Sequence, residues 1–245
     1  MTQVRSDWNV RDHVALADFV VQSHRGAGVL AAENSLEAFE LGWTLGCVPE
    51  ADVRVDSRGQ IVAAHDDPPA DAPTIAQVFE VMRSDHRRRL YLDFKDVDVV
   101  QLAAMAREAN VSGRVVFAAT DYALIRRWRE FVPDGQTLLW LGGTEAKIEE
   151  RFRELRDSNF VGITQLQIHT HVIDDRSATF AESDRFLIDK GNEVRSRGIL
   201  LQTLPYGGSA KQVYWKLMDL GFMSFATDHP QVTWDAVKAY YAEGK

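Results

Sequence analysis

The segments PEADVRVD at residues 49–56, TIAQVFEVMR at 74–83 and RLYLDFK at 89–95 decide the fold. The first and third segments are short apolar or alternating runs of the kind that form β-strands, and the second repeats its apolar residues with the period of a helix. A strand, a helix and a second strand in this order predict two parallel strands joined by a crossover helix. Residues 49–95 are therefore expected to form one β-α-β unit of an α/β protein.

The same rhythm continues on both sides of this unit. Further strands are expected at FVVQSH (19–24), RVVFAAT (114–120), QTLLWLG (136–142), GITQLQIH (162–169), ILLQTLP (199–205) and FMSFATD (222–228). Helices are expected over residues 34–46, 74–83, 99–109, 122–131, 144–158, 184–197, 211–221 and 233–241. Eight strands that alternate with helices predict an α/β fold of one particular kind, a single (β/α)8 TIM barrel.

One domain over residues 1–245 is expected, because barrels of this kind commonly occupy about 250 residues and no long linker divides the chain. Two smaller domains are the alternative that length alone leaves open. The run IVAAHD at 61–66 is also extended, and it either prolongs the second strand or forms a small hairpin.

Composition and charge exclude several classes of protein. Lys and Arg number 28 against 36 Asp and Glu, a net charge of −8 that disfavours a nucleic-acid partner. The single cysteine, Cys47, rules out a disulfide within the chain and is expected to be a buried thiol. No run approaches the roughly 20 apolar residues of a membrane span, and the N-terminus has no signal-peptide core. We expect a cytoplasmic protein without an integral membrane segment, whose oligomeric state the sequence does not reveal.

Chemically useful side chains gather near the ends of the first three predicted strands. They are His24 and Arg25, then Glu50 and Asp52, then His65 and Asp66, and finally Asp93 and Lys95. In a parallel barrel the C-terminal ends of the strands form one face, which carries the active site. These side chains are therefore expected to lie close together.

Three of these side chains predict a metal site. Side chains alternate along a strand, so Glu50 and Asp52 share one face of theirs, and Asp93 and Lys95 share one face of the next strand. Three carboxylates directed into one barrel mouth repel one another unless a positive charge lies among them. Because all three ligands are oxygen atoms, the expected cofactor is one divalent cation, Mg²⁺, Ca²⁺ or Mn²⁺.

The remaining side chains suit a small-molecule phosphodiester substrate. Arg25 and Lys95 could bind its anionic oxygens, and His24 and His65 could transfer protons near neutral pH. Which histidine is the acid and which the base does not follow from spacing. Each residue taken alone also has an ordinary reading, because buried Asp and His are commonly structural and a Lys at a strand end is commonly solvated.

The order of these motifs resembles the signature of glycerophosphodiester phosphodiesterases, which belong to the phospholipase-C-like phosphodiesterase barrels. That family has a His-Arg-Gly turn, a Glu-Asn-Thr segment, a Glu-x-Asp strand and a His-Asp turn. Here they read HRGAG at 24–28, ENS at 33–35, EADV at 50–53 and HDD at 65–67. The resemblance is dense over residues 19–95 and returns at SFATDHP, 224–230.

The resemblance implies a phosphoric diester hydrolase that acts in lipid metabolism. His24 and His65 would be its acid/base pair, Glu50, Asp52 and Asp93 its metal ligands, and Arg25 would lie near the phosphate. Lys95 and Asn34 would contact substrate. For Asn34, bracing of the loop and an ordinary helix cap are alternatives.

Three departures from the family bear on the substrate. Asp93 stands in LDFK where the family usually has Glu, the loop DDPPADAP at 66–73 is short, and Gln202 replaces an aromatic residue that would flank glycerol. The short loop and the Asp-x-Lys strand are also similar to sphingomyelinase D-like phospholipases, which form a cyclic phosphate. A lipid substrate ranks second, because no apolar membrane-contact loop is evident. A metal-dependent ligand-binding barrel without turnover is a third reading.

A second polar run lies outside this signature. Gln165, Gln167, His169 and His171 alternate along one predicted strand and beyond it, so they share a face if the strand continues. A second metal site and the polar lining of a pocket are both compatible with this pattern. The role of the two histidines stays open at this point.

Overall fold

The structure is a computed structural model that describes residues 6–243. The predicted α/β fold, a (β/α)8 barrel, is confirmed. Its parallel strands follow the order β1-β10-β9-β7-β6-β5-β4-β2, and β1 also pairs with β2. The strands are β1 (Val20–Ser23), β2 (Val48–Val55), β4 (Leu90–Phe94), β5 (Val115–Ala119), β6 (Gln136–Leu141), β7 (Gln165–Asp174), β9 (Leu200–Tyr206) and β10 (Ser224–Thr227). Each of the eight predicted strands is therefore present.

The described chain divides into two compact units. One comprises residues 22–139, and the other comprises residues 6–21 together with 140–243. The expectation of one domain over the whole chain stays a prediction.

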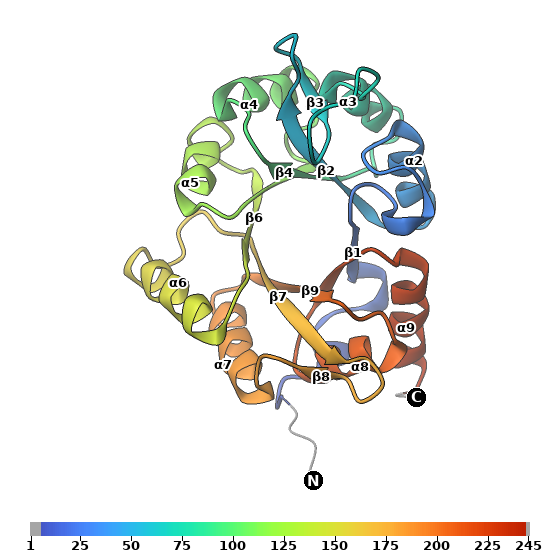
Figure 1. Cartoon of the computed structure of the whole chain (residues 1–245). Helices are drawn as coiled ribbons and strands as arrows, with labels where there is room; N and C mark the ends of the chain where they lie inside the picture. Colours follow the sequence, from blue (N-terminus) through green and yellow to red (C-terminus); the bar gives the residue numbers. More distant parts are fainter. Residues whose placement is uncertain (1–5, 244–245) are drawn as a thin grey trace. The chain divides into compact units, whose positions relative to one another are not determined.

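In the unit formed by residues 22–139, helices cover the outer face of the strands (Figure 1). They are α2 (Leu36–Thr44), α3 (Ile75–Arg83), α4 (Val99–Glu108) and α5 (Tyr122–Phe131). Phe117 of β5 stacks on Trp128 of α5 with ring centroids 4.8 Å apart, and both side chains are fully buried. This aromatic contact fixes α5 on the outer face of β5.

The start of α3 shows why these helices begin where they do. Thr74 accepts a hydrogen bond from the backbone N–H of Gln77, and the Gln77 side chain accepts one from the backbone N–H of Thr74. This reciprocal capping box satisfies two backbone donors that a helix terminus otherwise leaves without partners.

The extended run at 61–66 proves to be part of a hairpin. Strand β3 (Ile61–Ala63) pairs antiparallel with β2, with Val53 opposite Ala63. Asp56 organises the turn, because its Oδ1 accepts the backbone N–H groups of Arg58 and Gln60. The hairpin carries the chain back along β2 to Asp52, whose carbonyl oxygen accepts the N–H of Ala64, and His65 follows.

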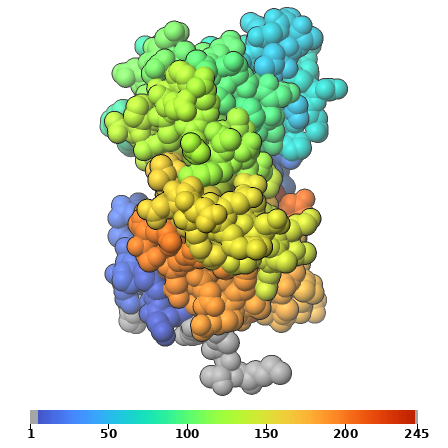
Figure 2. Space-filling model, turned by 90° about the vertical axis from the view of Figure 1, so that its left-hand side faces the viewer, coloured from blue at the N-terminus to red at the C-terminus, as the bar shows by residue number. Residues whose placement is uncertain are grey.

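The other unit has α6 (Glu145–Asp157), α7 (Asp184–Arg195), α8 (Lys211–Asp219) and α9 (Pro230–Ala242), preceded by the short helices α1 (Val10–His13) and η1 (Leu16–Asp18). Figure 2 shows α6 and α7, yellow and orange, on the surface of this unit. Arg156 of α6 joins them, because it pairs with Glu193 of α7 at 2.7 Å and with Glu149 of its own helix at 2.7 Å. A strand β8 (Thr179–Phe180) lies antiparallel to the extended end of β7.

Two smaller expectations can be compared with the structure. Among residues 6–243, no helix combines the length and the apolar character that crossing a membrane requires. Cys47 is 5% exposed, so the expected burial of this thiol is confirmed.

Candidate functional site

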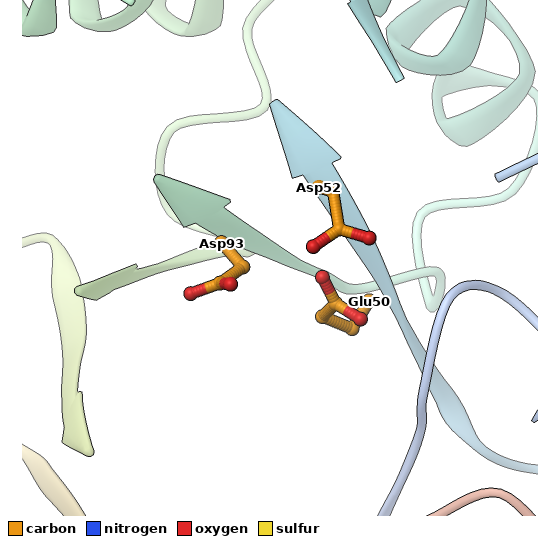
Figure 3. Close-up of side chains that lie close together, drawn as sticks. All are labelled: Glu50, Asp52 and Asp93. Carbon is orange, nitrogen blue, oxygen red and sulfur yellow. The ribbon is translucent and has the colours of Figure 1, made fainter. Parts of the chain in front are cut away.

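Three carboxylates from two neighbouring strands meet in the unit formed by residues 22–139. Parallel pairing of β2 with β4 places Asp52 directly opposite Asp93, and Glu50 lies two residues earlier on the same face of β2. Figure 3 shows the three carboxyl groups turned toward one another. One carboxylate oxygen of each lies within 4.8 Å of those of the other two. Glu50 and Asp52 are buried, and the Asp93 side chain is 15% exposed.

Lys95 supplies positive charge to this carboxylate cluster. Its ammonium nitrogen lies 2.9 Å from Asp52 Oδ1 and 2.6 Å from Asp93 Oδ2, and its side chain is 19% exposed. Burial disfavours the charged form of Asp52, but the Lys95 ammonium and the Asn34 amide outweigh it and hold the pKa of Asp52 below its usual range. Asp52 is therefore an anion at neutral pH.

Glu50 has the opposite electrostatic environment. Complete burial, with the negative charge of Asp52 as the next cause, raises the pKa of Glu50 to about 8. Its Oε2 accepts the backbone N–H of Arg25 at 2.8 Å, whereas its Oε1 is buried without a hydrogen-bond partner. A buried oxygen without a partner is costly unless another group binds it.

The cluster fits a hard divalent cation. All three ligands are carboxylates, the donor type that Mg²⁺, Ca²⁺ and Mn²⁺ prefer, and a cation among them would use the buried Oε1 of Glu50. It would also offset the repulsion from Asp52, which after burial is the next cause of the raised pKa of Glu50. Among residues 6–243 no other group of three or more His, Cys, Asp or Glu side chains has this arrangement.

The turn after β1 brings Arg25 to the cluster. Arg25 has φ of +52° and Gly26 has φ of +102°, so the chain reverses sharply after His24. A Cβ atom on Gly26 would lie 2.6 Å from the Cβ of Ala38, which explains why glycine occupies this position against α2. The Arg25 Nη1 pairs with Glu33 at 2.6 Å, and its Nε lies 3.6 Å from Asp52 Oδ2.

The structure excludes the helix-cap alternative for Asn34. Ser35, not Asn34, caps α2, because the Ser35 hydroxyl accepts the backbone N–H of Ala38 at 3.0 Å. Asn34 has φ of +57° and directs its side chain to Asp52 instead. Its Nδ2 donates to Asp52 Oδ2 at 2.8 Å, and its Oδ1 accepts the Asp52 backbone N–H at 3.0 Å. Asn34 therefore braces a carboxylate of the cluster.

Both histidines act electrostatically on the cluster. His24 lowers the pKa of Glu50, although burial and Asp52 outweigh it, and His65 contributes to the low pKa of Asp52. The His65 side chain is 37% exposed, and its Nδ1 lies 3.0 Å from Asp66. Arg54 fixes the position of His65 by donating from Nε to its carbonyl oxygen at 2.6 Å.

Two further residues interact with the predicted site residues, although the sequence-based prediction gave them no role. Glu33 is the ion-pair partner of Arg25, and Arg54 holds the backbone of His65 while it pairs with Asp96. The alternation of β2 does put Arg54 on the face of Glu50 and Asp52, which is a signal for Arg54. The signal for Glu33 is its place in the ENS motif at 33–35, which carries part of the resemblance.

A pocket of about 320 Å³ adjoins His65. One wall is the segment Ala32 to Ser35, and the other wall comprises residues 63–73. The short loop DDPPADAP therefore does form part of a pocket, with alanine and proline side chains between its carboxylates. Space for an organic group thus exists beside the predicted acid/base histidine.

The polar residues of β7 lie in the other unit. The strand continues to Asp174, so Gln167, His169 and His171 do share a face. His169 stacks on Trp140 with ring centroids 4.7 Å apart and lies 2.8 Å from Gln167 Oε1. His171 Nδ1 lies 2.7 Å from the buried carboxylate of Glu182. These contacts favour polar lining over a second metal site.

Comparisons with known proteins now bear on the fold. A glycerophosphoryl diester phosphodiesterase from Parabacteroides distasonis is similar, with a TM-score of 0.70 at 16% identity over 96% of this chain and 93% of that one. A phosphodiesterase from Oleispira antarctica, solved with the product sn-glycerol-3-phosphate, has a TM-score of 0.67 at 16% identity over 94% and 100%. The fold is similar to that of glycerophosphodiester phosphodiesterases.

A third solved glycerophosphodiester phosphodiesterase, from Agrobacterium tumefaciens, has a TM-score of 0.65 at 17% identity over 90% of this chain and 99% of that one. No family model and no curated protein matches the sequence. The resemblance to glycerophosphodiester phosphodiesterases that the sequence indicates is thus confirmed at the level of the fold. The catalytic, substrate-binding and metal-binding roles of individual residues stay predictions.

Proposed function

We propose that this protein is a metal-dependent phosphodiesterase that hydrolyses a small glycerophosphodiester-like substrate to a phosphomonoester and an alcohol. The observation that carries the proposal is the Glu50, Asp52 and Asp93 cluster, which has cationic and histidine side chains around it within one unit. The fold similarity to glycerophosphodiester phosphodiesterases supports the same reaction class.

Charge balance supports an anionic substrate. With Glu50 protonated, the anions Asp52 and Asp93 balance the cations Arg25 and Lys95. With Glu50 ionised and a divalent cation bound by the carboxylates, the three ligands, Arg25, Lys95 and the cation together have a net positive charge, which Glu33 offsets while it pairs with Arg25. A cation held there would polarise a phosphoryl oxygen. A phosphodiester, which carries one negative charge, is then attracted to the site.

The residues around the cluster would bind the phosphate and transfer protons. Arg25 and Lys95 bind the phosphate oxygens, after partly exchanging their present carboxylate partners for the substrate. One of His24 and His65 removes a proton from the attacking water molecule while the other gives a proton to the departing alcohol. His65 faces the pocket of about 320 Å³, so the alcohol that leaves beside it has room.

The test is ³¹P NMR of the purified protein with glycerophosphodiesters in EDTA and in Mg²⁺, Mn²⁺ or Ca²⁺. We expect a phosphomonoester signal that depends on the metal. His24→Ala and His65→Ala are each expected to lower the rate at least about 100-fold, because general acid-base catalysis contributes that much. His86→Ala is the control, since His86 is exposed outside the cluster.

Each alternative has its own outcome. A cyclic phosphate that precedes the monoester would assign the cyclising reaction instead. Metal-dependent ligand binding without turnover of any diester would indicate a binding barrel. Full activity in both histidine variants would refute the acid-base assignment.

A further inference from the structure

A second pocket, of about 520 Å³, lies at the N-terminal ends of β2 and β4. One wall is the end of α2 with the start of β2, and the other is the segment that precedes β4. Asp52 lies four residues beyond Val48, the first residue of β2, which corresponds to a rise of about 13 Å. Of the described residues that line this pocket, none belongs to the carboxylate cluster or to the pocket beside His65. It is therefore a separate place for a small molecule, and its volume is typical of such sites.

Three successive arginines, residues 87–89, line this pocket, which we call the arginine pocket. Among the described lining residues they face one acidic side chain, Asp85. Arg87 pairs with that carboxylate at 2.6 Å, and Arg88 pairs with Glu40 of α2 at 2.8 Å. These two pairs are each neutral as a whole. The charge of the arginine pocket is therefore set by the third arginine, Arg89.

Arg89 is half-buried and has a neutral partner. Its Nη2 donates to the side-chain oxygen of Gln136 at the start of β6, and no carboxylate among residues 6–243 forms an ion pair with it. A guanidinium has five N–H donors in a planar fork, so one amide oxygen leaves most of them for another acceptor. A partly buried cation without a counter-ion favours the binding of an anion.

The segment that carries the arginines is held in place by the rest of its unit. Arg114 donates from Nη1 to the carbonyl oxygens of Asp85 at 3.0 Å and of Arg88 at 3.3 Å. The Nε1 of Trp43 donates to the carbonyl oxygen of Arg89 at 2.7 Å, and the Arg88 guanidinium lies over the Trp43 ring, 4.8 Å from its centroid. Because the backbone is fixed before a ligand arrives, binding requires little further ordering of the chain.

We propose that the arginine pocket binds a small soluble phosphomonoester, with Arg89 as the principal donor to its phosphate group. Such a group carries a charge of about −1.5 to −2 at pH 7 and has three acceptor oxygens, which suit the fork of a guanidinium. Arg87, whose side chain is 80% exposed, can turn from Asp85 to the same phosphate. A carboxylate ligand, with fewer charges and oxygens, would use fewer of these donors. The site lies outside the proposed reaction and does not depend on it.

The experiment is calorimetric titration of the protein in EDTA with glycerol 2-phosphate, and with succinate for comparison. The parent protein is expected to bind the phosphomonoester more tightly than succinate. Gln136→Glu is expected to weaken phosphomonoester binding about tenfold or more, because it places a carboxylate beside Arg89 and keeps the shape of the side chain. Arg89→Gln, which removes the guanidinium itself, is expected to have the same effect.

Arg83→Gln is the matched control, because Arg83 is exposed on α3 outside the arginine pocket and its loss changes the net charge equally. This variant is expected to bind the phosphomonoester as the parent does. No binding by the parent, equal binding of succinate, or unchanged binding in Gln136→Glu would overturn the proposal, and so would an equal loss in Arg83→Gln.

Turnover of glycerophosphodiesters with added metal is measured on the same proteins and is expected to be unchanged in Gln136→Glu. A joint loss of turnover and phosphomonoester binding in that variant would place the ligand at the reaction site and overturn the separate pocket. Absence of turnover in the parent would refute the phosphodiesterase function, while binding that depends on Arg89 would still support the arginine pocket.

Discussion

A single residue, Glu50, determines how the cluster responds to pH. Burial and the neighbouring Asp52 raise the pKa of Glu50 to about 8, so at pH 7 the metal-free protein holds a proton at this carboxyl group. A metal ion must displace that proton in order to bind. The apparent metal affinity is therefore expected to rise with pH up to about 8 and to level off above it.

Calorimetric titration with Mn²⁺ between pH 6 and 9, in buffers of different ionisation enthalpy, measures both affinity and proton release. Close to one proton is expected to leave at pH 7 and fewer at pH 9. Glu50→Gln is the control, because it has no proton to displace and is expected to bind metal weakly at every pH. An affinity that stays flat from pH 6 to 9 would contradict this assignment.

At the level of an element, two adjacent residues at the start of α2 have different roles, one in the stability of the fold and the other in metal binding. Ser35 caps the helix, and Asn34 braces Asp52. Ser35→Ala is expected to lower the free energy of unfolding by about 1 kcal/mol, the usual cost of losing a cap, with no change in metal affinity. Asn34→Gly keeps the positive φ but removes the amide, and it is expected to weaken metal binding about tenfold or more, as removal of a ligand-orienting group does.

Urea unfolding and Mn²⁺ titration of both variants separate the two effects. If Ser35→Ala weakened metal binding as much as Asn34→Gly, the division between cap and brace would be incorrect.

Elements proved easier to predict than the conformations of loops. Strands such as β5 are buried apolar runs, and helices such as α3 have clear periodicity and a side-chain cap, so local sequence determines them. The register of Asp52 opposite Asp93 follows from the parallel pairing of β2 with β4, which the positions of both carboxylates near strand ends indicate. The cluster was therefore accessible from the sequence.

The features that the sequence did not predict depend on tertiary contacts. The positive φ of Asn34 and the pairing of Arg25 with Glu33 arise in the segment between β1 and α2, where Gly26 packs against Ala38. The contact of His171 with Glu182 depends on a hairpin that continues β7 beyond its expected end. The periodicity of apolar residues in the sequence does not predict such long-range contacts.

For the whole molecule, metal binding and folding are linked. A ligand that binds only the folded chain stabilises it by about 2.7 kcal/mol at a free concentration 100 times its dissociation constant. Added Mn²⁺ is therefore expected to raise the melting temperature in proportion to the logarithm of its concentration. Differential scanning calorimetry with and without EDTA measures the shift.

Glu50→Gln is expected to change the melting temperature in two ways: the metal-free protein becomes more stable at high pH, and added Mn²⁺ no longer stabilises it strongly. The folded pKa of Glu50 lies above its unfolded value, so this group favours folding at low pH and loses that contribution as pH rises through about 8. At pH 9 the metal-free variant is therefore expected to melt above the metal-free parent, while added Mn²⁺ shifts it little. A variant less stable than the parent at pH 9 would show that the burial of Glu50 carries no electrostatic cost.

The position of Lys95 between Asp52 and Asp93 affects the order of events during biosynthesis. Because the chain carries its own counter-ion, a newly made molecule can complete its barrel in a cell that is short of metal. If the cluster binds the proposed cation, the cation can then enter after folding, and the supply of cations around the folded protein, more than the folding reaction, would select the ion.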